Sequence, residues 1–284
     1  MVCRTALRSA LATLLLGASS VSAGPIDFTG FVEHDFNPAD KQTKVIQVNS
    51  NPLNNIVQMP EMTAQGIING YALKDIRLSY DFNSDTMYVG LNTYSIAGSA
   101  IGTGGPDLAA LLAAQGGQDP ADVGGRKSIS LGFAGVNRND LSTRGDNIMV
   151  AGIPANKALA GPGLIGFTVS TMTGGRDAAV QHSYGSLLSN QMGDLAFNPS
   201  AAHPGFEFTI KNFSKVSSNL NPEEGFWVNA YLGSPDDRGI GEEGSGWIKI
   251  PAFEKQVVPE PTTWLAWTAV LASAGAYRVR RRSR

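Results

Sequence analysis

Two acidic segments hold the residues of this chain whose types and spacing best suit ligand binding. One reads SPDDRGIGEEG between two late strand-like runs, and the other reads D-x-N-x-D. Calcium takes several carboxylate, amide and carbonyl oxygens from flexible loops, so both segments are candidate calcium sites. The alternative interpretations are a solvated acidic loop for the first and a plain hairpin turn for the second, which lacks the glycine and distal glutamate of an EF-hand. The residues concerned are Asp236, Asp237, Glu242 and Glu243 in the first segment, and Asp81, Asn83 and Asp85 in the second.

The residue types that most often carry catalysis show no catalytic spacing. The histidines His34, His182 and His203 are far apart, and none belongs to a motif such as H-E-x-x-H. The sequence contains no G-x-S-x-G nucleophile motif, no Walker loop and no dinucleotide-binding glycine pattern after a strand. Two carboxylates that the fold brings face to face, as in glycosidases, stay open as an alternative. We therefore predict no catalytic residue, no enzymatic activity and no cofactor other than the calcium considered above.

The elements that must position these residues are predicted to be β-strands. Short runs that alternate apolar and polar residues recur between turn signals, and long helical patterns are almost absent. Strand after strand without intervening helices predicts an all-β protein, an antiparallel and jelly-roll-like β-sandwich. The predicted strands are 44–49, 75–80, 86–92, 128–133, 147–153, 164–172, 205–213, 225–232 and 246–250.

The clearest local element is a β-hairpin formed by 75–80 and 86–92. The turn sequence DFNSD joins the two runs, and Asp and Asn favour turns because their side chains bond nearby backbone groups and tolerate left-handed conformations. The alternation predicts that Ile76, Leu78 and Tyr80 share one face of the hairpin.

One stretch departs from the strand pattern. Residues 107–115 (DLAALLAAQ) follow a proline and precede two glycines, which predicts a short helix inserted over one end of the sandwich. Residues 173–204 form the weakest part of the strand pattern and are the best place for a break within the body.

Aromatic residues are spread over several of the predicted strands. Exposed in a row on one sheet, they would form a sugar-stacking face; the alternative is that they are core residues or cross-strand pairs, the usual role in a sandwich. The residues are Trp227, Trp247, Tyr71, Tyr80, Tyr88, Tyr94, Tyr184 and Tyr231.

The first 23 residues have the layout of a secretory signal peptide. Arg4 and Arg8 precede an apolar run at 10–18, and a small-residue end follows, with cleavage expected after Ala23. The only cysteine of the chain, Cys3, lies in this removed segment. The mature chain is therefore expected to contain no disulfide and no thiolate ligand.

The last 26 residues combine three distinct parts. Pro259-Glu260-Pro261 disfavours helix and central strand, because each proline fixes its own backbone and restricts the residue before it. An uncharged run from Trp264 to Tyr277 follows, which is short for a permanent bilayer span of about 20 residues. A basic cluster closes the chain and favours keeping that end in the cytoplasm. Its first four arginines are Arg278, Arg280, Arg281 and Arg282.

This terminal pattern resembles the PEP-CTERM sorting signal of Gram-negative bacteria. The resemblance covers about a tenth of the chain and includes the motif, the hydrophobic helix and the arginine cluster in order. It implies that the protein is a substrate of exosortase, a membrane cysteine enzyme thought to cut near the motif and pass its substrates to the cell surface. The expected domains are a signal peptide at 1–23, a β-sandwich body at 24–258 and a sorting signal at 259–284.

The charge of the body limits its partners. The whole chain has 22 basic and 24 acidic residues, and the two terminal segments hold seven of the basic and one of the acidic residues, so the body has a net charge of −8. An acidic body does not suit nonspecific nucleic-acid binding.

The signals and the body together predict an exported protein with a structural or adhesive role at the cell surface or in the extracellular matrix. The expected partners are the secretion machinery, the inner membrane transiently, exosortase and extracellular polysaccharide. One alternative is a surface carbohydrate-binding module, with or without calcium. A weaker one is an extracellular hydrolase.

Overall fold

A computed structural model describes residues 26–40, 42–48, 73–94, 128–153, 168–174, 182–189, 205–217, 220–233, 243–244 and 246–255. Residues Ala23–Glu254 form one compact unit. The predicted signal peptide, the predicted helix at 107–115 and the sorting signal lie outside the described residues.

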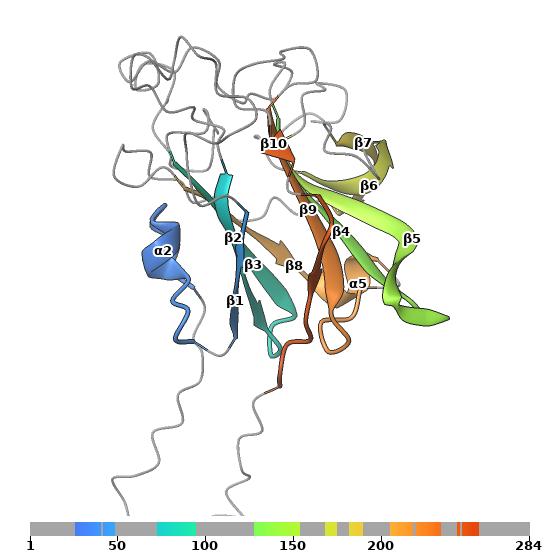
Figure 1. The fold of residues 1–284 in the computed structure, drawn as a ribbon, viewed down its shortest axis with the longest axis horizontal. Coiled ribbons are helices and arrows are strands. Elements are labelled where there is room, and N and C mark those ends of the chain that lie inside the picture. Colours follow the sequence, from blue (N-terminus) through green and yellow to red (C-terminus); the bar gives the residue numbers. More distant parts are fainter. Residues whose placement is uncertain are drawn as a thin grey trace, which may run out of the picture. The chain divides into compact units, whose positions relative to one another are not determined.

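The described chain forms two antiparallel sheets, which confirms the predicted all-β sandwich (Figure 1). The first sheet has the order β1-β2-β3-β8, and the second has the order β10-β9-β4-β5-β6-β7, with β11 also paired to β9. The strands are β1 (Thr43–Gln47), β2 (Leu73–Asp81), β3 (Thr86–Thr93), β4 (Ser128–Asn137), β5 (Asp140–Ile153), β6 (Thr168–Gly174), β7 (Ser183–Ser189), β8 (Phe206–Lys211), β9 (Phe226–Gly233), β10 (Glu243–Gly244) and β11 (Ile248–Ile250).

Alternate residues of both sheets form one shared hydrophobic core. The β4 residues Ile129, Leu131 and Phe133 pack in the same cluster as Val89 and Phe208 of the first sheet, and all five are fully buried. Successive strand residues point to opposite faces, so the remaining residues of each strand lie on the two outer faces of the sandwich. Buried polar residues, among them Ser130 and Asn229 of the second sheet and Asp75 and Arg77 of the first, lie on these outer faces.

The predicted hairpin is present as β2 and β3. Tyr80 pairs with Met87 and Ile76 with Leu91, and the predicted inner face of Ile76, Leu78 and Tyr80 is buried in the core. The outer face of β2 is buried as well, which the alternation did not predict.

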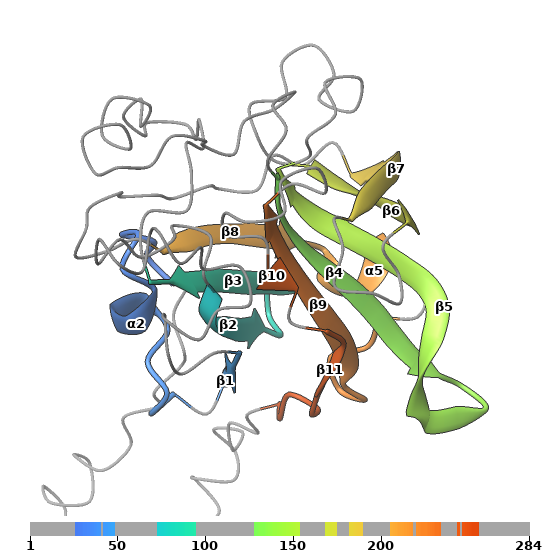
Figure 2. The ribbon, with the colours of Figure 1, turned by 45° about the horizontal axis from the view of Figure 1, so that its top comes forward.

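A segment near the N-terminus accounts for this second burial. The short helix α2 (Val32–Asp35) lies over the outer face of the first sheet (Figure 2). A Cβ atom built on Gly90 would lie 2.6 Å from Val32 Cγ1, and one built on Gly205 would lie 2.2 Å from Val32 Cγ2. Glycine at these two positions therefore lets the segment approach the sheet closely.

The C-terminal end of the compact unit is fixed to the sandwich through Phe253 and Glu254. Phe253 belongs to the shared core, and its N–H donates to the Pro222 carbonyl at 2.8 Å. The side-chain amide of Gln42 donates to the Glu254 carbonyl at 2.6 Å. The folded body is thus anchored up to Glu254, close in sequence to Pro259.

Candidate functional site

The outer face of the seven-stranded sheet has small residues at its centre. Cross-strand pairing places Tyr231, Ser130, Gly152 and Thr168 in one row, and Asn229, Gly132, Val150 and Ser170 in the next. Residues paired directly across antiparallel strands share a face. The glycines and serines add little side-chain volume above β4 and β5, so larger side chains can pack closely on the sheet there.

His182 fills part of this space. Its Nδ1 atom lies 2.8 Å from Ser130 Oγ, and its Nε2 atom lies 2.5 Å from Asn229 Oδ1. Because the Asn229 oxygen only accepts, Nε2 carries the ring hydrogen and Nδ1 accepts from the Ser130 hydroxyl. A Cβ atom on Gly132 would lie 3.5 Å from His182 Cε1 and 3.2 Å from Trp247 Cη2. Gly132 therefore makes room for both rings.

A serine, a histidine and an asparagine in one chain of hydrogen bonds have the residue types of a nucleophile, a base and an orienting group. Two observations argue against catalysis. Ser130 is fully buried, so its oxygen does not face solvent. Burial also lowers the pKa of His182 to about 4, despite the opposing effect of the hydrogen bond to Asn229. Since an effective base has a pKa near the working pH, His182 is a weak base at neutral pH.

Several buried polar atoms of this face have no hydrogen-bond partner among the described residues. They are Thr168 Oγ1, Ser170 Oγ, Trp227 Nε1 and Asn229 Nδ2, whereas the Tyr184 hydroxyl interacts with Ser130. We call Ser130, Thr168, Ser170, His182, Tyr184, Trp227, Asn229 and Trp247 the His182 cluster. Its aromatic members Tyr184, Trp227 and Trp247 pack on Ala134, Ile148, Val150 and Met172 and are only half-buried.

Positive charges lie beside the two tryptophans. The Arg144 guanidinium is 4.6 Å from the Trp247 ring centroid, and Lys249 Nζ is 6.0 Å from that of Trp227. Cation–π attraction favours both contacts. The cluster itself is composed of neutral side chains at pH 7, because His182 is uncharged there.

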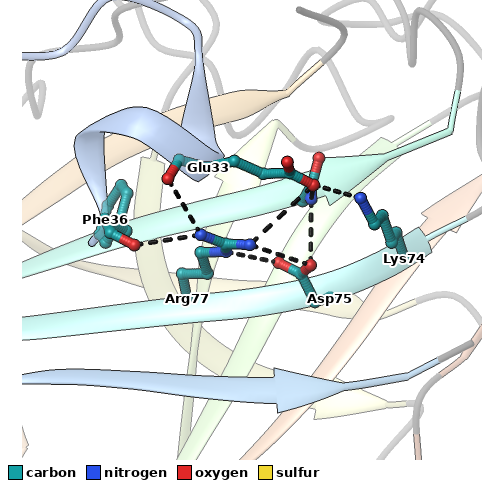
Figure 3. Close-up of polar contacts among 6 residues, drawn as sticks. Glu33, Phe36, Lys74, Asp75 and Arg77 are labelled. Carbon is teal, nitrogen blue, oxygen red and sulfur yellow. Dashed lines mark hydrogen bonds and ion pairs between the residues drawn. The ribbon is translucent and has the colours of Figure 1, made fainter. Parts of the chain in front are cut away.

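A second polar network lies on the outer face of the other sheet, under α2 (Figure 3). Arg77 Nε donates to Asp75 Oδ1 at 2.9 Å, and Arg77 Nη1 donates to the Phe36 carbonyl at 3.1 Å. Asn92 Nδ2 donates to Asp75 Oδ2 at 3.0 Å, and Lys74 pairs with Glu33 nearer the surface. This network clamps the N-terminal segment to the sheet and is structural.

Glu207 extends the polar region of this face. Its Oε2 atom accepts from the Gly30 N–H at 2.7 Å, and its side chain is fully buried. Burial, and next the negative charge of the neighbouring Asp35, raise the pKa of Glu207 to about 9. Asp35 accepts hydrogen bonds from the Thr29 N–H at 2.6 Å and from its hydroxyl. Glu207 is therefore protonated at neutral pH beside a carboxylate that the chain's own donors stabilise.

The D-x-N-x-D segment forms the β2–β3 turn. Asp81 accepts from the Asn83 N–H at 2.9 Å and from the Ser84 hydroxyl at 2.6 Å. Asp85 has φ 51° and accepts from the Tyr80 hydroxyl at 2.7 Å and from the Ser214 N–H at 2.9 Å. Burial opposes ionisation of Asp85, but these hydrogen bonds lower its pKa overall. The carboxylates of this turn thus bind protein donors.

The other predicted calcium ligands fall largely outside the described residues. Asp236, Asp237 and Glu242 lie there, and Glu243 lies on β10. Among the residues that the structure describes, no group of three or more histidine, cysteine or acidic side chains is arranged to hold a metal. Calcium binding by the acidic loop stays a prediction.

The remaining candidates are spread over the molecule. His34 is exposed next to Asp35, and His203 and Tyr71 are outside the described residues. Tyr80 lies in the shared core, as the core interpretation predicts, whereas Tyr88 and Tyr231 are buried outside that core. The contacts of His182 with Ser130 and Asn229 were missed, because they join residues 52 and 47 positions apart and leave no short-range signal.

In the described segments, no helix is both long and apolar enough to cross a membrane. Comparison of the chain with protein-family models, curated proteins and solved structures found no match.

Proposed function

We propose that this chain is an exported protein, sorted by exosortase to the cell surface or extracellular matrix, with a structural or adhesive role. The signal-peptide layout at 1–23 and the resemblance of 259–284 to a PEP-CTERM signal support the route. The body that would be delivered is a β-sandwich with an acidic net charge and no cysteine. Its partners along the route are the secretion machinery, the inner membrane and exosortase.

The observation that best supports sorting is the short stretch of sequence between the folded body and the motif. The chain is fastened to the sandwich by Phe253 and by the contact of Gln42 with Glu254. Residues 255–258 alone separate this anchored end from Pro259. Four extended residues span at most about 14 Å, so cleavage near the motif would release a body that keeps its whole core and only a short tail.

Replacing Pro259-Glu260-Pro261 with three alanines is expected to leave the protein in the membrane fraction of the producing bacterium. The physical reason is that the uncharged run and the arginine cluster still anchor the chain, while the cleavage motif is lost. The measurement is immunodetection of the body in membrane, surface and medium fractions.

A matched control replaces the three preceding residues, Gln256, Val257 and Val258, with alanine. This control is expected to be released as the unchanged protein is. Release of the motif variant at the unchanged level would count against handling by exosortase.

A surface carbohydrate-binding module is the second candidate. The observation in its favour is the His182 cluster, where polar groups and half-buried aromatic rings share one outer face. For this cluster we propose binding and not catalysis, because Ser130 is buried and His182 is a weak base at neutral pH.

A further inference from the structure

The N-terminal segment at 26–36, which we call the strap, packs on the first sheet through apolar contacts of its own. Val32 and Phe36 of the strap are buried and form a small cluster with Tyr88 of β3, and Phe28 packs against this cluster. None of these four residues belongs to the shared core, which lies on the other face of the same sheet. The strap can therefore leave the sheet while the core of the sandwich stays intact.

Two buried carboxyl groups lie where the strap meets β8. Glu207 of β8 is fully buried, and its Oε2 atom accepts from the Gly30 N–H of the strap at 2.7 Å. The Asp35 side chain of the strap is 1% exposed and accepts from the Thr29 N–H at 2.6 Å. The two carboxyl groups also interact directly with each other. One acid thus belongs to the strap and the other to the sheet that the strap covers.

Within the described part of the chain, no lysine or arginine pairs with either carboxyl group. Arg77 is separated from Glu207 by Gly90 in one row of paired residues, and it pairs with Asp75. Two carboxylates in one buried site repel each other, so one of the two keeps its proton. The titratable and charged groups around Glu207 are Asp35 and, in contact with Asp35, the exposed His34 on the strap, Tyr88 on β3, and Asp75 and Arg77 on β2.

Closing of the strap therefore takes up a proton. When the strap is open, water reaches Glu207 and its carboxyl group ionises at neutral pH, whereas burial and the charge of Asp35 raise the pKa of Glu207 to about 9 when the strap is closed. Closing is most favourable at low pH and becomes less favourable as the pH rises toward 9. One proton per closing event changes the ratio of open to closed strap by about tenfold per pH unit.

We propose that the strap is a proton-controlled cover of the first sheet, which Glu207 and Asp35 hold closed while Glu207 carries a proton. As the pH rises above neutrality, the strap opens as one unit and uncovers Tyr88 and the polar face of β2, and the sandwich keeps its core. The proposal concerns the folded body and does not depend on how the protein is exported.

Hydrogen exchange of backbone amides in the purified full-length chain at pH 7, 8 and 9 tests the proposal. Peptic fragments that cover the strap report on the Gly30 N–H, which donates to Glu207, and on the Phe36 N–H, which donates to the Val32 carbonyl at 3.0 Å. After correction for the exchange rate of an unfolded peptide at each pH, the protection of the strap is expected to fall about tenfold per pH unit. The fragment that contains β3 is expected to be better protected than the strap at each pH, because only wider unfolding opens it.

Two variants assign the effect to Glu207. Glu207→Gln still accepts from the Gly30 N–H and does not ionise, so the protection of its strap is expected to be independent of pH between 7 and 9. The matched control is Glu33→Gln, which alters a partly exposed acid of the same strap and is expected to show the same fall as the unchanged protein. Circular dichroism at pH 7 checks that both variants fold.

Three outcomes would overturn the proposal. The first is constant protection of the strap between pH 7 and 9 in the unchanged protein, which requires no variant. The second is the same fall of protection in Glu207→Gln. The third is equal protection of the strap and of the β3 fragment at every pH, because the opening would then be unfolding of the whole body.

Discussion

Replacing Arg77 with methionine is expected to lower the free energy of unfolding by about 3–5 kcal/mol, the range for breaking a buried ion pair. Asp75 is fully buried, and Arg77 is the cation that contacts it at 2.9 Å. Among the described side chains, the substitution leaves the Asp75 charge with the Asn92 amide as its hydrogen-bond donor. It also removes the hydrogen bonds that Arg77 donates to the Phe36 and Glu33 carbonyls, so the attachment of α2 to the sheet is weakened. Urea unfolding at pH 7 measures the change.

Two further variants make this experiment specific. Lys74→Met removes the Lys74–Glu33 pair, both of whose side chains are more than a third exposed, and is expected to change the stability by at most about 1 kcal/mol. The double variant Asp75→Leu/Arg77→Met removes both buried charges and is expected to be more stable than Arg77→Met alone. An Arg77→Met protein as stable as Lys74→Met would show that the network does not clamp the segment.

Replacing Glu207 with glutamine is expected to remove most of the dependence of stability on pH between 7 and 9. Burial and the adjacent Asp35 raise the pKa of Glu207 from 4.5 to about 9. In that window the folded protein keeps a proton that the unfolded chain has lost. The stability linked to this proton is fully present below pH 4.5 and is lost as the pH rises through 9, at about 1.4 kcal/mol per pH unit. Glutamine still accepts from the Gly30 N–H but does not ionise.

Measuring the free energy of unfolding above pH 7 separates the contribution of Glu207 from that of His182. Burial lowers the pKa of His182 to about 4, so its contribution is present above pH 6.5 and is lost as the pH falls toward 4. Unfolding in urea at several pH values between 7 and 9 provides the measurement. Glu224→Gln, at an exposed position, is the control and is expected to follow the unchanged protein. A Glu207→Gln profile parallel to that of the unchanged protein would contradict the assignment.

The alternation of apolar and polar residues was enough to predict the sandwich and most of its strands. The hairpin of β2 and β3 came from its turn residues and from Ile76, Leu78 and Tyr80. Strand β7 was missed, because SYGSLLS has neither alternation nor β-branched residues and pairs with β6 irregularly. Its side chains Leu187 and Leu188 are also exposed, so burial leaves no pattern in the sequence.

The burial of polar residues on the two outer faces could not be predicted, because it depends on segments that are distant in the sequence. In KDIRLSY the polar residues occupy the positions of a solvated face, yet Asp75, Arg77 and Ser79 are buried because a distant segment covers them. The His182 cluster likewise joins β4, β9 and the start of β7, which are far apart in the sequence. The sequence of β4 does hint at packing on its outer face. Its core residues Ile129, Leu131 and Phe133 alternate with the small residues Ser130, Gly132 and Ala134.

Intact mass spectrometry of the protein recovered from the surface and medium of the producing bacterium tests the central claim most directly. We expect a chain that begins at Gly24 and ends near Pro259, because the proposed export and sorting would remove both terminal segments. A chain from the surface or medium that still carries residues 262–284, or the absence of the protein from both fractions, would contradict the proposed sorting.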